Sequence, residues 1–103
     1  MILTTIPNMG GRDFQVLGMV TGSMVQSKNA FKDIGAGFKS MIGGELHSYT
    51  EMMQEARHAA TMRMIDQAEQ MGADAIIGVS YATSSIVQGA AEVLATGTAV
   101  KLL

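Results

Sequence analysis

The chain has 103 residues, a length typical of one domain, so we treat residues 1–103 as a single domain. Its formal net charge is −2 and its seven Lys and Arg residues are never adjacent, which disfavours nucleic-acid binding through phosphate contacts. It has no Cys, which excludes disulfides and thiolate sites, and no apolar run approaches the ~20 residues that span a membrane. We expect a cytoplasmic protein with no nucleic-acid or membrane partner.

The composition also indicates self-association. Charged residues make up only 16% of the chain, below the usual quarter, and Gly is abundant with 12 residues. Monomeric proteins usually keep a charged surface without large apolar patches. We therefore expect another copy of the chain to cover part of the surface. A monomer with few charges is the alternative.

The first part of the chain predicts two strands. Residues 2–6 are β-prone and end at Pro7, which is typical of an edge or docking strand. Residues 14–26 alternate with period two, which predicts a longer strand whose first face carries every even-numbered residue from Phe14 to Met24. Gly18 and Gly22 leave space on that face. Close approach of a helix is the favoured interpretation, and a ligand pocket is the alternative.

The middle of the chain predicts helices. Residues 29–42 have helical spacing interrupted by Gly35 and Gly37, which indicates a weak or broken helix. A long helix begins near Glu45, and Gly72 is expected to cap its end in the left-handed conformation. Its apolar stripe, rich in Ala and Met, consists of Leu46, Tyr49, Met53, Ala56, Ala60, Met64, Ala68 and Met71.

The last third of the chain predicts a hairpin. Residues 74–87 and 92–103 alternate with period two, and a short segment containing Gly89 joins them. The expected fold is therefore α+β, with one long helix on a small, mainly antiparallel three-stranded sheet and an extra short N-terminal strand. The pattern does not decide which face of the sheet meets the helix.

Several short motifs resemble one known family. They are Gly43-Gly44-Glu45, Tyr49-Thr50, Glu55-Ala56-Arg57, Arg63-Met64, Gly72-Ala73-Asp74-Ala75-Ile76-Ile77-Gly78-Val79 and Gly97-Thr98-Ala99-Val100. Together they cover nearly the whole chain and resemble the YbjQ-like family of uncharacterised small proteins, for which heavy-metal binding has been suggested. The resemblance implies a dodecin-subunit-like fold assembled as a ring, typically a pentamer. It carries no enzymatic activity onto this sequence, and we expect a non-enzyme.

Four residues of the long helix are candidate ligands for a divalent metal ion. His47, Glu51, Glu55 and His58 follow one another at spacings of four, four and three, so they share an arc of roughly 80° opposite the apolar stripe. A complete site needs ligands from neighbouring subunits, because one helix offers one face only. A solvated polar face is the alternative interpretation.

Two apolar residues lie on the same side of the helix. Met62 and Ile65 are expected to contact a neighbouring subunit, with isolated surface residues as the alternative. The sequence thus predicts a ring-forming protein that binds metal ions. The alternative function is binding or storage of a small molecule in pockets between subunits, near Gly18, Gly22 and residues 35–44.

Overall fold

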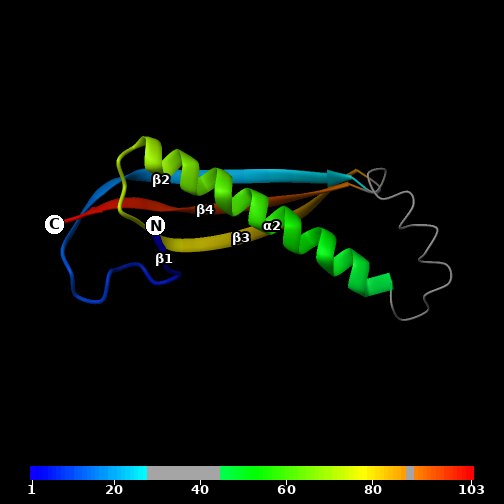
Figure 1. Cartoon of the computed structure of the whole chain (residues 1–103), viewed down its shortest axis with the longest axis horizontal. Helices are drawn as coiled ribbons and strands as arrows, with labels where there is room; N and C mark the ends of the chain where they lie inside the picture. Colours follow the sequence, from blue (N-terminus) through cyan, green and yellow to red (C-terminus); the bar gives the residue numbers. More distant parts are fainter. Residues whose placement is uncertain (28–44, 88–89) are drawn as a thin grey trace.

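The computed structural model describes the backbone of residues 1–27, 45–87 and 90–103 and the side chains of residues 1–26, 50–84 and 90–103 (Figure 1). The segment 29–42, predicted as a weak helix, lies outside the described residues. The elements are β1 (Ile2–Leu3), β2 (Phe14–Ser27), α2 (Glu45–Gln70), β3 (Ala75–Val87) and β4 (Ala90–Leu102). The α+β architecture is confirmed, and the elements within the described residues follow the predicted order.

The sheet has four strands in the order β1-β3-β4-β2, so the expected three-stranded sheet is wrong in strand number. β4 lies between β2 and β3 and pairs antiparallel with both, whereas β1 pairs parallel with β3. The short N-terminal strand joins the sheet because its backbone bonds continue beyond Leu3: the Val79 N–H donates to the Thr4 carbonyl at 3.0 Å, and the Gly78 N–H donates to the Ile6 carbonyl at 2.9 Å. Its place at the edge agrees with the prediction from Pro7.

The C-terminal end of α2 is closed by the glycine that the sequence indicated. Gly72 has a φ of 79°, the left-handed conformation that L side chains disfavour. The Ala73 N–H donates to the Ala68 carbonyl and the Gly72 N–H donates to the Glu69 carbonyl, both at 3.0 Å. This pair of bonds is the Schellman motif, which satisfies carbonyls that the helix itself leaves unpaired and turns the chain into β3.

The main core lies between α2 and one face of the sheet, which the helix crosses diagonally (Figure 1). The small residues of the predicted stripe lie fully buried, so the helix axis can approach the strands closely. Val93, Ala95 and Ala99 of β4 contact this core, which identifies the face of the sheet that meets the helix. The buried members of the core are Val20, Ala56, Ala60, Met64, Ala68, Ile76, Val79, Val93, Ala95 and Ala99.

Irregularities in the strand pairing change which face the side chains take. The pairing register shifts between Val16 and Gly18 on β2 and between Ile77 and Ser80 on β3. Such bulges insert an extra residue and reverse the alternation beyond it. Phe14 therefore packs on a second, smaller core with Ala75, Ile77, Val100 and Met9, while Val20 packs under the helix. The expectation that Phe14 and Val20 share one face is wrong for this reason.

Candidate functional site

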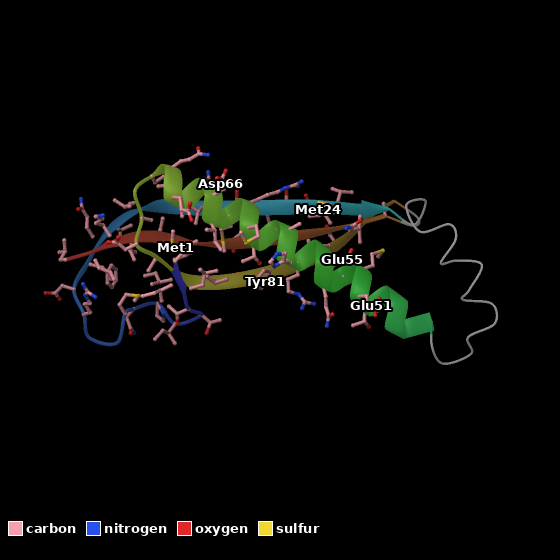
Figure 2. All side chains as sticks on the ribbon, viewed as in Figure 1. Met1, Met24, Glu51, Glu55, Asp66 and Tyr81 are labelled. Atoms are coloured by element: carbon pink, nitrogen blue, oxygen red, sulfur yellow. The ribbon has the colours of Figure 1, made fainter. Side chains whose placement is uncertain are left out.

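Three of the four predicted metal ligands lie among the described side chains of α2. Glu51, Glu55 and His58 are all exposed, and the side chain of His47 lies outside the described residues. Glu51 and Glu55 follow each other along the N-terminal part of the helix (Figure 2). In the part of the chain that the structure describes, no three His, Cys, Asp or Glu side chains lie close enough together to hold a metal ion. The described candidate ligands of one chain therefore lie on an exposed surface of the helix and do not form a complete metal site.

The two predicted contact residues differ in exposure. Met62 has 49% of its surface exposed, so it is accessible to a neighbouring molecule. Ile65 is half-buried and packs against the core between α2 and the sheet. Of this pair, Met62 presents the larger apolar surface outward.

The two glycines of β2 lie under the helix. A Cβ atom at Gly22 would overlap the Ala60 carbonyl oxygen and the Met64 backbone nitrogen, so the helix backbone itself fills this space. At Gly18, where φ is 148°, a Cβ atom would lie 3.2 Å from the terminal methyl group of Met71. The space that the two glycines leave is therefore occupied by α2 and by Met71, as close approach of a helix requires.

Two side chains of α2 bond to the backbone of β2 on either side of Gly22. The Oε1 atom of Gln67 accepts a hydrogen bond from the Thr21 N–H at 2.8 Å. The Nη1 atom of Arg63 donates to the Ser23 carbonyl at 2.6 Å. Sequence analysis did not identify this contact. The available signal was the four-residue spacing of Arg63 and Gln67, which places both on one flank of the helix.

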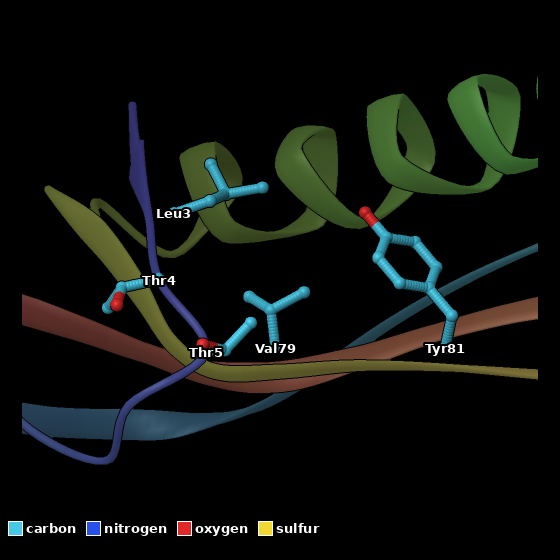
Figure 3. Close-up of a pocket in the computed structure, with 5 residues that line it drawn as sticks. All are labelled: Leu3, Thr4, Thr5, Val79 and Tyr81. Carbon is cyan, nitrogen blue, oxygen red and sulfur yellow. The ribbon is translucent and has the colours of Figure 1, made fainter.

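A second polar contact joins α2 to β3. The hydroxyl groups of Thr61 and Tyr81 lie 2.7 Å apart, and the Thr61 hydroxyl also donates to the Arg57 carbonyl at 2.7 Å. Tyr81 stands up from β3 toward the helix (Figure 3). Beside it lies an open groove of about 200 Å³, lined by Leu3, Thr4, Thr5, Val79 and Tyr81. This volume is smaller than the roughly 300–1,000 Å³ of typical ligand pockets.

Asp74 ties the start of β3 to the end of β4. Its Oδ2 atom accepts the Leu102 N–H at 2.8 Å, and its Oδ1 atom lies 3.4 Å from Nζ of Lys101. The bond from Leu102 lowers the pKa of Asp74 below its ordinary value of 3.8, loss of surrounding water opposes this, and the positive charges of Lys101 and Arg12 lower the pKa further. The charged carboxylate therefore links the start of β3 to the end of β4.

Among the described residues, no helix is long and apolar enough to cross a membrane.

Comparison with known proteins places this chain in one family. A family model described as "Putative heavy-metal-binding" matches residues 1–103. A UPF0145 protein of Vibrio parahaemolyticus is 55% identical over all of this chain and 99% of its own length. A UPF0145 protein of Clostridium novyi is 52% identical over the full length of both chains, and one of Thermosipho africanus is 54% identical over 99% of this chain and 95% of its own.

The fold is also similar to a solved structure. A crystal structure of a protein of unknown function from Pediococcus pentosaceus, assigned to the DUF74 family, matches with a TM-score of 0.61. The match covers all of this chain and 98% of that one at 18% identity, so it supports the fold alone. The family match over the whole chain shows that it belongs to the YbjQ-like family, and its relatives above 50% identity are named UPF0145 proteins.

Proposed function

We propose that this chain is a non-enzymatic cytoplasmic protein that assembles into a ring, with a pentamer as the expected size, and binds divalent metal ions between its subunits. The observation that carries the proposal is the exposure of Glu55 and His58, three residues apart on α2. An imidazole and a carboxylate are both ligands that Zn²⁺ accepts. The family description supports metal as the ligand.

The need for several subunits follows from the incomplete ligand set. Zn²⁺ is usually held by three or four protein ligands, whereas the described part of one chain brings no three suitable side chains together. Neighbouring subunits would supply the remaining ligands. His47 belongs to the proposed set through its place on α2, one turn before Glu51.

Exposed apolar residues on β2 support self-association. Val16, Met19 and Val25 expose 60%, 74% and 51% of their surfaces. Met19 and Val25 alternate with the buried Val20, so they lie on the face of the sheet opposite the helix. Met62 adds an exposed apolar residue on α2. A second copy that covers the exposed residues of β2, or Met62, would remove apolar area from water.

Zinc titration of untagged protein by isothermal calorimetry tests the metal proposal. The variant Glu55→Ala plus His58→Ala is expected to lose most of its zinc binding, because it removes two of the three proposed ligands that are exposed on α2. A matched control, Glu69→Ala plus Gln70→Ala, changes exposed residues on the same helix and is expected to bind zinc like the wild type. Equal isotherms for the ligand variant and the wild type would contradict metal binding at this site.

Native mass spectrometry tests the assembly separately, because it reports subunit number and bound mass together. A ring predicts one dominant oligomer, with zinc bound in proportion to the subunits. A monomer at micromolar concentration would contradict the ring.

Small-molecule binding between subunits is the second candidate. Within the described part of the chain, the groove beside Tyr81 supports this function, whereas α2 fills the space at Gly22. Residues 35–44, which belonged to the predicted pocket, lie outside the described residues. A bound organic molecule in the native mass spectrum would favour this function over metal binding.

A further inference from the structure

The β2 strand is an outer strand of the sheet with 14 residues, Phe14–Ser27, and it pairs with β4 on one side only. A long outer strand carries a row of backbone N–H and C=O groups that can pair with a strand of another molecule. Natural proteins usually block such edges with charges, bulges or covering segments. The unpaired side of β2 therefore needs a feature that prevents uncontrolled pairing with strands of other molecules.

The outward backbone groups of β2 include those that α2 binds. Thr21 and Ser23 stand opposite Thr96 and Leu94 of β4 in an antiparallel ladder, where alternate residues direct their backbone groups to the same side. The Thr21 N–H points to Gln67 rather than to β4, and the Ser23 carbonyl points to Arg63. A strand added to β2 would need these same two groups.

Gly22 explains how the helix reaches this edge. It lies between Thr21 and Ser23, and the missing side chain lets the α2 backbone touch the strand. Arg63 and Gln67 then lie above the edge, where each can bond to one neighbour of Gly22. Gly22 therefore lets the helix approach the strand, and Arg63 and Gln67 bond to the strand edge as a result.

We propose that Gln67 and Arg63 guard the β2 edge against pairing with a strand of a second copy of this chain. They satisfy one donor and one acceptor in the middle of the strand, so an incoming strand must break two hydrogen bonds before it forms its own. The guanidinium of Arg63 also places a positive charge at the edge, which repels the same charge on an identical edge. This role is independent of metal binding and of the residues proposed as ligands.

The test compares two double variants of the full chain. Arg63→Ala plus Gln67→Ala removes the guard. Arg57→Ala plus Gln70→Ala removes the same two residue types from exposed positions of the same helix, away from these two bonds to β2. Sedimentation velocity over a range of concentrations measures particle size, and thioflavin T fluorescence measures added β-pairing. The guard variant is expected to form larger particles and bind the dye, whereas the control matches the wild type.

Two further variants keep the test decisive if the guard variant folds poorly. Gln67→Ala alone is expected to speed hydrogen exchange at the Thr21 amide roughly five-fold, as loss of one hydrogen bond implies. Adding Thr21→Lys, at an exposed position in the middle of β2, to the guard variant is expected to restore the wild-type particle size, because a lysine on an outer strand opposes pairing. An unchanged Thr21 exchange rate, a guard variant of wild-type size, or a control that aggregates equally would each overturn the proposal.

Discussion

Replacing Gly22 with Ala is the sharpest test of how α2 sits on the sheet. The added Cβ atom would overlap the Ala60 carbonyl oxygen and the Met64 nitrogen and would lie 3.1 Å from the Arg63 carbonyl carbon. All three obstacles are helix backbone atoms, which cannot rotate away as a side chain can. The helix must therefore move as a unit, and this movement weakens the bonds from Arg63 and Gln67 to β2.

The expected loss in the free energy of unfolding has two parts, the steric overlap at Gly22 and the weakening of two hydrogen bonds. Overpacking usually costs about 1–3 kcal/mol, and the rigid obstacle places Gly22→Ala near the upper end. The two hydrogen bonds add about 0.5–1 kcal/mol each, because they lie on an exposed edge. The sum is about 4 kcal/mol in the free energy of unfolding. For a domain near 100 residues this lowers Tm by roughly 20 °C.

Thermal unfolding followed by circular dichroism measures this change, with all variants at the same protein concentration because association shifts Tm. Gly10→Ala is the matched control: its φ is 68°, and a Cβ atom there has no neighbour within 4 Å. Only the conformational penalty of about 1–2 kcal/mol is expected at this position. If Gly22→Ala lowered Tm no more than Gly10→Ala, the close contact between α2 and β2 would be refuted.

Three other substitutions test separate contacts. Because the pKa of Asp74 is lowered, its charged form stabilises the fold above pH 3.8, and this contribution disappears as the pH falls through the folded-state pKa. Urea unfolding should therefore show Asp74→Asn less stable than wild type at pH 7, with a difference that shrinks as the pH falls below 3.8. Tyr81→Phe removes the 2.7 Å bond to Thr61 and should cost about 0.5–1.5 kcal/mol; a double-mutant cycle with Thr61→Val should show coupling, and strict additivity would argue against the bond. Gly97→Ala places a Cβ atom 2.5 Å from a side-chain methyl group of the buried Ile76 and 3.3 Å from the Ile77 carbonyl oxygen. Because the nearest obstacle is a side chain rather than helix backbone, its loss of Tm should be smaller than that of Gly22→Ala.

Periodicity in the sequence was sufficient to predict most of the fold. The helix was expected to begin near Glu45 and to be capped by Gly72, and the structure has a helix over Glu45–Gln70 followed by that cap. The three long strands were placed within two residues of their ends, whereas the first strand, predicted over residues 2–6, covers only Ile2–Leu3. The pattern is strong here because each element packs one regular face on the same core. β1 was predicted as a strand, but two residues contain no signal for the partner or the direction of pairing.

Features that depend on contacts between distant residues were not predicted. A bulge is a local shift in pairing, so the alternation of residues 14–26 gave no indication that Phe14 and Val20 take opposite faces. The bonds from Arg63 and Gln67 to β2 depend on the crossing angle of the helix, which no single segment encodes. The spacing of the candidate metal ligands is sufficient to place them on one surface of the helix. Ligands that other subunits would supply cannot be predicted from the pattern of a single chain.

The smaller core under Phe14 has a consequence for local unfolding. Among the described residues, this core covers the face of the sheet opposite α2 near Ala75 and Val100, at the end of the sheet where both chain termini lie (Figure 1). Farther along, Met19 and Val25 are exposed on that face. One end of the sheet is therefore packed on both faces, and the other mainly on one. Local opening is expected to begin at the thinner end, so amide protection should fall progressively along β4 from Val100 toward Ala91.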